Sequence, residues 1–528
     1  MKSDLRIGNK RISLLYVTLG VIFAVGSLLR LTALELNPMG LHQDEAFCAY
    51  NAWSIMNFGV DSYENVRPVY YISGMSILYS YLQMPFIALF GMHTWVFRLP
   101  QAILGSVSIL TMYGFGKELL GPRTGIALAA LLAINPWHIQ QSRVGLDCNV
   151  AVFMLLSAVY FLCRYLNGKK KSLWGAAVFF GLTLYCYALT WLVVPIFLVL
   201  TIIFFRKRIQ WDRSLIGPVL LLFFLALPLL LFVAVNIGII PQIRTSWFSI
   251  PHMPGMRTGE LSLSLSTIKS RFLWLVAVLW AQHDTEWWIS NETVGSFYYI
   301  SMPFILLGLV YCLKAFLQNV FWKKELPLHF VAALWFAAGF ITGCCIDYAV
   351  YHKLNYLIVP VITLGAIGII WFCRIWKEIK WLPWLFAAAY LVMFGVYVYA
   401  QASFGIHYEN YGHSALSHMH WYKYEGAIAR AEELTDGDVG IVNLHYGNVL
   451  LYSGLNPWEF NEQVNYIGDD LAFREVSRIG RYRFDAVPGE SGSQGVVFIY
   501  PYNIEERLKE LGYVTEYVTE CYGVAYKE

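Results

Sequence analysis

Charged residues are scarce in this sequence. Asp, Glu, Lys and Arg make up 14% of the 528 residues, whereas 58% are hydrophobic and 17% are aromatic. A soluble globular protein carries roughly 25% charged residues. No single soluble core absorbs so large an apolar fraction, so the composition predicts a polytopic membrane protein. The net charge of +3 is small and unevenly spread, which gives no indication of a nucleic-acid partner.

Several short motifs are also missing. None of the nine cysteines forms a C-x-x-C pair, which argues against a zinc or dithiol redox site, and no Gly-rich nucleotide loop occurs. The adjacent Cys344 and Cys345 are interpreted as packing residues. No small-x-small cleavage site follows the first apolar run, which is about 20 residues long and can cross a bilayer. This run predicts a retained first helix with a cytoplasmic N-terminus.

Apolar segments separated by basic loops predict about eleven transmembrane helices. Basic residues favour the cytoplasmic side of short loops, and the clusters of this sequence then fall on one side. The run 70–91 would invert every later loop if it crossed, so we expect it to be interfacial or re-entrant. The predicted spans lie near 14–34, 95–117, 124–142, 148–167, 173–188, 190–206, 215–235, 296–316, 328–346, 354–374 and 382–401.

Polar stretches predicted to face outward divide the chain. They are the first outer loop (35–94), a long outer loop (236–295) and the tail (402–528). The predicted fold class is an all-α polytopic membrane bundle over residues 1–401, with interfacial helices in the first outer loop, plus a small C-terminal α/β domain. We expect a multi-pass protein of the cytoplasmic membrane whose C-terminal domain is extracytoplasmic. The tail has strand-like runs at 438–444 and 495–501, and helical patterns at 424–434 and 503–513.

Three carboxylates are predicted at the outer membrane boundary. Asp44 and Glu45 follow the first helix in "GLHQDEAFCAYNAW", and Asp147 lies between the third and fourth spans. A carboxylate near the apolar boundary is costly and often functional, and its raised proton affinity suits general-base work on a hydroxyl. The structural alternative is that the acids only start helices, with Asp147 as an N-cap.

Basic residues are predicted on the same side as these acids. They are Arg67, Arg143, His352 and Lys353. Cations that converge with acids at one outer cavity indicate an anionic ligand such as a phosphate. Each could instead be an interfacial side chain whose head reaches the water.

Aromatic residues of the long outer loop are candidates for sugar or isoprenoid contact. They are Trp287 and Trp288 in "WAQHDTEWWIS", where belt anchoring is the alternative reading. His283, Asp284 and Glu286 in the same stretch match no specific metal-binding spacing. The sequon "NET" at 291–293 is predicted to face outward.

The order of several motifs resembles the GT-C superfamily of membrane glycosyltransferases, above all its protein O-mannosyltransferase and lipid A aminoarabinose transferase branches. The resemblance covers about 40–165 well and the later helices only as architecture. The motifs are D-E after the first helix, R-P-x-Y-Y (67–71), F-G-x(6)-R-L-P (90–100), L-G-x-R-x-G (120–125), N-P-W-x-I-x-x-S-R (135–143) and the Asp that follows.

The resemblance implies a function and a set of site residues. A sugar would pass from a polyprenyl-phosphate-linked donor to an acceptor hydroxyl on a glycan, lipid or protein, outside the cytoplasm and with inversion. The family's catalytic acid maps onto Asp44 and its second functional acid onto Asp147, with Glu45 as the paired neighbour. Contacts to donor, acceptor or membrane lipid would come from Arg67, Tyr70, Arg143, His352, Lys353, Tyr356 and Trp287.

The adjacent Asp-Glu lacks the D-x-D spacing of the metal-using relatives, so the resemblance implies no obligatory metal, with a divalent ion still possible. "HKLNYLIVPV" (352–361) resembles a late family segment that touches the lipid phosphate.

Two other functional classes compete with this hypothesis. A transporter or flippase of lipid-linked sugars would commonly show repeated halves and interrupted helices, and no internal repeat is evident. A non-catalytic membrane scaffold would use its tail to bind a partner, and its acids would only cap helices. Loss of sugar transfer in Asp44→Asn and Asp147→Asn variants would distinguish the glycosyltransferase from both.

Overall fold

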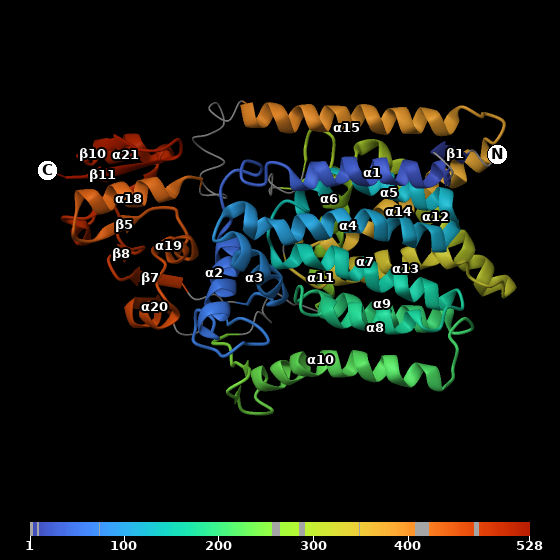
Figure 1. The fold of residues 1–528 in the computed structure, drawn as a ribbon, viewed down its shortest axis with the longest axis horizontal. Coiled ribbons are helices and arrows are strands. Elements are labelled where there is room, and N and C mark those ends of the chain that lie inside the picture. Colours follow the sequence, from blue (N-terminus) through green and yellow to red (C-terminus); the bar gives the residue numbers. More distant parts are fainter. Residues whose placement is uncertain are drawn as a thin grey trace. The chain divides into compact units, whose positions relative to one another are not determined.

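The chain forms two compact units, a helical unit and a mixed unit. The computed structural model describes residues 4–7, 10–72, 74–255, 264–284, 291–347, 349–406, 422–468 and 475–527 (Figure 1). The helical unit comprises Met1–Thr32, Leu99–Leu230 and Thr258–Ala400. The mixed unit comprises Ala33–Arg98, Leu231–Arg257 and Gln401–Glu528, so it groups the tail with parts of both predicted outer loops.

Apolar helices make up most of the helical unit, and each of the predicted spans overlaps at least one of them (Figure 1). Seven helices of the described chain are long and apolar enough to cross a membrane, and five more apolar helices are shorter. The number of crossings stays a prediction. Helices with residues in this unit are α1 (Leu14–Leu31), α4 (Thr94–Leu120), α5 (Pro122–Ala133), α6 (Pro136–Gln141), α7 (Asp147–Leu166), α8 (Ser172–Thr183), α9 (Thr190–Phe205), α10 (Ile216–Asn236), α11 (Leu265–Ala281), α12 (Met302–Trp322), α13 (Val331–Cys344), α14 (Ile358–Ile375) and α15 (Leu382–Ile406).

The predicted single helix over 124–142 is wrong, because the structure divides it into α5 and α6. Asn135 adopts an extended conformation between them, and its side-chain oxygen accepts a hydrogen bond from the backbone N–H of His138 at 2.9 Å. Pro136, which has no N–H to donate, occupies the first turn of α6. The Asn-Pro pair therefore ends one helix and starts another.

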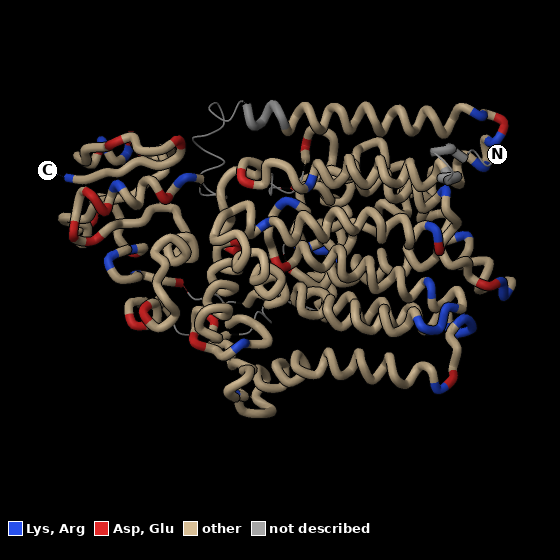
Figure 2. Tube along the Cα trace, in the orientation of Figure 1, with Lys and Arg blue, Asp and Glu red and all other residues tan. Residues whose placement is uncertain are grey.

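Loops predicted to be cytoplasmic lie together at one end of the helical unit, where the basic residues gather (Figure 2). Lys169 Nζ lies 2.5 Å from Glu118 Oε1, and Lys170 Nζ lies 2.6 Å from Asp212 Oδ2. Arg208 donates to the carbonyl of Leu326 at 3.1 Å. These bonds join four successive predicted cytoplasmic loops, although the side of the membrane that this end faces stays a prediction.

Segments predicted to face outward meet at the opposite helix ends of the same unit. The hydroxyl of Tyr298 donates to the carbonyl of Ile134 at 2.5 Å. The backbone N–H of Tyr351 donates to Asp284 Oδ2 at 2.6 Å. Hydrogen bonds therefore join the bends that follow α5, α11 and α13. This agrees with a chain whose successive spans run in opposite directions, which places these bends at the same end of the unit.

The first part of the mixed unit contains two short helices, α2 (Gln43–Phe58) and α3 (Leu78–Phe90), and a small hairpin of β3 (Ile243–Arg244) and β4 (Ser249–Ile250). Small residues of α2, Ala46 and Ala49 among them, pack in one apolar cluster with Ile87 of α3 and with Phe97. Among the described residues of the predicted interfacial run 70–91, the helical ones are residues 78–90. Its placement at the membrane surface stays a prediction.

The tail forms an α/β domain around a seven-stranded sheet of order β10-β11-β9-β5-β8-β7-β6 (Figure 1). β5 pairs in parallel with β8 and β9, and the remaining pairs are antiparallel. Its elements are α18 (Tyr424–Leu434), β5 (Val439–Ile441), α19 (Tyr446–Ser453), α20 (Pro457–Gln463), β6 (Val464–Ile467), β7 (Glu475–Ile479), β8 (Tyr482–Arg483), β9 (Val497–Pro501), α21 (Glu505–Glu510), β10 (Val514–Tyr517) and β11 (Tyr522–Tyr526).

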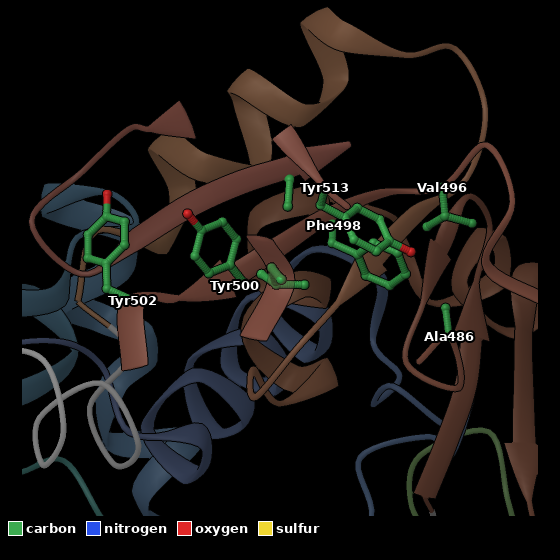
Figure 3. Close-up of a cluster of buried hydrophobic side chains, with 8 residues drawn as sticks. Ala486, Val496, Phe498, Tyr500, Tyr502 and Tyr513 are labelled. Atoms are coloured by element: carbon green, nitrogen blue, oxygen red, sulfur yellow. The ribbon is translucent and has the colours of Figure 1, made fainter. Parts of the chain in front are cut away.

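Aromatic side chains fill the core of this domain on one side of β9. Phe498, Tyr500 and Tyr513 are buried with Leu508 of α21 (Figure 3). The rings of Phe498 and Tyr513 meet edge to face, with centroids 5.6 Å apart. The predicted α/β domain is thus confirmed, with strands and helices at the positions that its apolar runs indicated.

Candidate active site

Helix α2 begins with a capping box that places both predicted acids in its first turn. His42 is the N-cap, and its Nδ1 accepts a hydrogen bond from the backbone N–H of Asp44 at 3.1 Å. Glu45 Oε2 accepts in return from the backbone N–H of His42 at 3.1 Å. Acidic side chains in the first turn also interact favourably with the positive end of the helix dipole.

Glu45 is fully buried and both of its oxygens are bound by Arg98. Arg98 Nε donates to Oε1 at 2.8 Å, and Nη2 donates to Oε2 at 2.8 Å. Both side chains have an exposed fraction of 0%. The remaining Arg98 donors reach the carbonyls of Pro38 at 2.7 Å and Gly40 at 2.5 Å. This pair therefore fixes the loop before α2 and holds the Glu45 carboxylate away from any substrate.

Asp44 has the opposite environment, although it is the next residue. Its side chain is 40% exposed, and its ion pair among the described residues is a loose one to His42 Nδ1 at 3.9 Å. The buried Glu45–Arg98 ion pair anchors the start of α2 and so holds Asp44 in place, while the half-exposed Asp44 carboxylate stays accessible to solvent. Of the two adjacent acids, Asp44 is the one that can meet a hydroxyl.

Helix α19 of the tail packs against α2 within the mixed unit. Asn448 of α19 donates to the carbonyl of Leu41 at 3.0 Å. The hydroxyls of Tyr63 and Tyr446 lie 3.1 Å apart. His445 is the N-cap of α19, and burial, with a smaller contribution from the nearby His42, lowers its pKa to about 4. The C-terminal domain therefore borders the segment that carries Asp44.

The two predicted ligand contacts of the first outer loop differ in availability. The Arg67 side chain is exposed, and among the described residues it makes no ion pair. The Arg67 guanidinium lies beside Gly59: a Cβ atom added to this glycine would be 3.6 Å from Nη2 of Arg67. Tyr70 is buried, its hydroxyl donates to the carbonyl of Gly74 at 2.8 Å, and its ring packs on Phe232. Arg67 can reach a ligand, whereas Tyr70 contributes to the packing of the mixed unit.

Asp147 lies in the first turn of α7, in the helical unit. The N-cap is Leu146, so the structural alternative in which Asp147 is the N-cap is wrong. Asp147 has an exposed fraction of 8%, and its Oδ1 accepts from the backbone N–H of Cys148 at 2.7 Å. Arg143, four residues earlier, is buried and donates to the carbonyl of Leu29 at 2.6 Å.

The late segment "YHKLNY" meets the start of α7 through a residue that sequence reasoning missed. Asn355 Nδ2 donates to Asn149 Oδ1 at 2.8 Å and to Gln141 Oε1 at 3.2 Å. The neighbours His352 and Lys353 are partly exposed. Within the helical unit, the structure thus brings together the segments that hold Asp147, Arg143, His352 and Lys353. Tyr356 is buried, and its hydroxyl has no hydrogen-bond partner among the described residues.

Two fully buried arginines were not predicted as site residues, although the motif F-G-x(6)-R-L-P contains one of them. One is Arg98, and the other is Arg30 near the end of α1, which is 0% exposed. Arg30 donates to the carbonyls of Leu132 at 2.9 Å and Ala133 at 3.0 Å, and its Nη2 lies 2.7 Å from His138 Nδ1. It therefore binds the C-terminal carbonyls of α5 and the α6 segment. A charge inside an apolar run was the available signal.

The predicted aromatic and metal-binding candidates of the long outer loop are only partly described. Trp287, Trp288 and Glu286 lie outside the described residues. Asp284 accepts a backbone hydrogen bond from Tyr351, which gives this carboxylate a structural partner. In the described part of the chain, no three His, Cys, Asp or Glu side chains are grouped so as to hold a metal ion.

The fold and one stretch of sequence define a class of protein. Residues 75–235 match the family model of dolichyl-phosphate-mannose-protein mannosyltransferases. Two crystal structures of ArnT from Cupriavidus metallidurans, one in the apo state and one bound to undecaprenyl phosphate, are similar to this chain. Each aligns with a TM-score of 0.55 at 14% identity, over 97% of this chain and 97% of ArnT. The chain therefore has the GT-C fold of a multi-pass membrane protein, which confirms the resemblance seen in the sequence.

Particular relatives are matched over shorter stretches. The provisionally named mannosyltransferases YkcB and YycA of Bacillus subtilis (strain 168) are 34% identical over 92 residues and 27% identical over 143 residues. These stretches cover 17% and 27% of this chain, and 13% and 20% of the two relatives. The apo oligosaccharyltransferase of Archaeoglobus fulgidus aligns with a TM-score of 0.52 at 13% identity, over 83% of this chain and 63% of that one. Asp147 lies inside the family match and Asp44 before it.

Proposed function

We propose that the chain is a glycosyltransferase that moves a sugar from a polyprenyl-phosphate-linked donor to an acceptor hydroxyl, with inversion, on the extracytoplasmic face of the membrane. The family match and the GT-C fold support the reaction class. The ArnT structure that contains undecaprenyl phosphate supports a lipid-linked donor. The acceptor is a glycan, a lipid or a protein.

The observation that carries the proposal is the contrast between Asp44 and Glu45. Asp44, with its half-exposed carboxylate, is the general base that takes the proton of the acceptor hydroxyl. The acceptor oxygen then forms a bond to the anomeric carbon, and the bond from that carbon to the phosphate oxygen breaks. The electron pair leaves with the polyprenyl phosphate. Glu45 acts through Arg98 as a positioning residue and transfers no proton.

The leaving phosphate gains charge as its bond to the sugar breaks, so nearby cations lower the barrier. The exposed Arg67 and the partly exposed His352 and Lys353 are our candidates for this role. Asp147 is the proposed second functional acid. Arg143 and Tyr356 are the proposed supports of its segment, and Trp287 is proposed to contact substrate. We propose that no divalent ion is obligatory, which turnover in the presence of a chelator tests.

Sugar transfer by the full chain in lipid nanodiscs tests the proposal. Undecaprenyl-phosphate-linked mannose, glucose and N-acetylglucosamine are supplied as donors, with extracted envelope glycans as acceptors. We expect release of undecaprenyl phosphate together with labelled glycan, and loss of both in Asp44→Asn and in Asp147→Asn. Glu64→Gln, at an exposed acid of the mixed unit, is the matched control and keeps full turnover.

Full turnover in both aspartate variants contradicts the catalytic assignment. Movement of labelled lipid across vesicles without cleavage of the sugar–phosphate bond would instead support a flippase.

A further inference from the structure

The C-terminal domain contains a pocket that no proposed catalytic residue lines. Its volume is about 490 Å³, within the range of roughly 300–1,000 Å³ that small-molecule sites occupy. Three helices and the β7–β8 turn form it. Its polar lining residues are Glu432 of α18, Tyr452 and Ser453 of α19, Gln463 of α20, and Arg481 and Tyr482 of the turn and β8.

Hydrogen bonds already organise the polar groups of this pocket. Glu432 Oε2 accepts from the hydroxyl of Tyr452 at 3.1 Å, and Glu432 Oε1 accepts from the hydroxyl of Tyr482. Burial, with a further contribution from Glu432, raises the pKa of Tyr452 to about 12, so this hydroxyl stays protonated. Each of these oxygens keeps lone pairs that can accept from a ligand.

Donors complete the lining. Arg481 donates through Nε to the carbonyl of Gly437 at 3.1 Å and through Nη2 to the carbonyl of Thr435, which fixes the guanidinium at the pocket. Gln463 is exposed, and its amide makes no side-chain hydrogen bond among the described residues. The lining thus combines acceptors, donors and two tyrosine rings, with one negative and one positive side chain.

This combination selects one class of ligand. An anionic polymer would meet the Glu432 carboxylate, which is unfavourable. An acyl chain would cover the Glu432 carboxylate and the Arg481 guanidinium and offer a hydrogen bond to neither. A neutral sugar presents hydroxyls to both donors and acceptors and a face of C–H groups to the rings. We propose that this pocket binds a neutral oligosaccharide.

The position of the pocket within the mixed unit connects it to α2. Leu455, which also lines it, accepts a hydrogen bond from the hydroxyl of Tyr50 at 2.7 Å. Tyr50 follows Asp44 by six residues, about 9 Å along the helix axis. The pocket is therefore placed to hold the distal part of an acceptor glycan, and this role in the reaction rests on the proposed function.

Calorimetric titration of the full chain in nanodiscs, without donor, tests the pocket. The probes are mannotriose and triacetylchitotriose as neutral sugars, and a glycerol-phosphate oligomer as the anionic comparison. We expect at least one neutral probe to bind. Glu432→Ala should weaken its binding roughly tenfold or more, because a charged hydrogen-bond partner is lost. Gln463→Ala removes an exposed side chain, keeps the fold, and should weaken binding about threefold.

Gln494→Ala is the matched control, because Gln494 is exposed on the same domain and does not line the pocket. Three results overturn the proposal: no binding of either neutral probe, wild-type affinity in both pocket variants, or tighter binding of the anionic oligomer. Asp44→Asn should bind the probe as the wild type does. Binding with no transfer by any donor would refute the proposed function and leave the pocket assigned.

Discussion

The first turns of α2 and α7 each contain one of the two proposed functional aspartates, but the structure holds the two in different ways. Asp44 is 40% exposed beside a buried Glu45–Arg98 ion pair. Asp147 is 8% exposed, and neutral amides, Asn149 and Asn355, join its helix to a distant segment. The start of α2 is therefore held by a charged pair, and the start of α7 by hydrogen bonds between neutral amides. Substitutions that remove these contacts should lower the stability of the protein by different amounts and with a different dependence on salt.

The largest effect is expected for Arg98→Met. Removal of the guanidinium leaves Glu45 charged and buried, which typically costs about 3–5 kcal/mol. It also removes donors to the carbonyls of Pro38 and Gly40. We expect a large fall in the unfolding temperature of the purified protein, measured by intrinsic fluorescence.

Arg67→Met is the matched control for this substitution. Arg67 is exposed and makes no ion pair among the described residues, so its loss should change stability by no more than about 0.5 kcal/mol. Equal unfolding temperatures for the two variants would show that the α2 framework does not depend on the buried charge pair.

Asp61 extends the comparison to an acid that is buried without a cation among the described residues. Burial raises its pKa from 3.8 to about 7, against the opposing effect of hydrogen bonds from Asn65 and Tyr63. Between these values the folded state binds more protons than the unfolded state. The stabilisation from Asp61 is thus complete below about pH 4 and is lost as the pH rises through 7, with a slope of at most about 1.4 kcal/mol per pH unit.

Asp61→Asn removes this titration. Chemical unfolding of both proteins from pH 4 to 8 should show that the stability of the wild type relative to the variant falls as the pH rises. A difference that stays constant over this range would contradict the assigned direction.

Asn355→Leu tests the amide framework at α7. The variant leaves the buried oxygens of Asn149 and Gln141 without this donor, at a cost of about 1–3 kcal/mol. Asn319→Leu, which loses a partly exposed bond to the carbonyl of Lys324 in the same unit, should cost less. Because neutral bonds are involved, the difference between the two variants should not depend on salt. A strong salt dependence would show that charge also holds this site.

The smallest effect is expected for Asn448→Ala, in helix α19, which binds the residue Leu41 just before α2. The variant loses one hydrogen bond to the carbonyl of Leu41, a cost of about 1 kcal/mol. Turnover should fall a few-fold, because the residues before Asp44 become less constrained. A transfer rate equal to that of the wild type would mean that α19 does not help to position Asp44.

Much of the fold could be predicted because the bilayer imposes strong rules on the sequence. Apolar length located the helices, and the basic loops around Lys169 and Arg208 grouped as their charge indicated. The strand-like runs of the tail became β5 and β9. Asn135 and Pro136 indicate the break between α5 and α6. The apolar pattern on both sides of this pair nevertheless led to the prediction of a single helix.

The candidate site was less predictable, because its decisive contacts join distant residues. The structural alternative, that the acids of "HQDEAF" start a helix, is confirmed, but the sequence gives no sign that Asp44 and Glu45 differ in environment. What separates them is Arg98, 53 residues away from Glu45. Asn355 and Asn149 are 206 residues apart. No local pattern encodes such pairings, and the shared chamber expected for Asp44 and Asp147 stays a prediction, since each residue belongs to a different unit.

The turnover of Asp44→Asn and Glu45→Gln, each expressed per folded molecule, tests the central claim most directly. We expect Asp44→Asn to keep the wild-type unfolding temperature and to lose transfer by about 10²–10⁴-fold, the usual contribution of a general base. Glu45→Gln should lose stability and keep its transfer rate to within about tenfold once the unfolded fraction is subtracted. The reverse pattern, with Glu45→Gln stable but inactive and Asp44→Asn active, would contradict the assignment of Asp44 as the base.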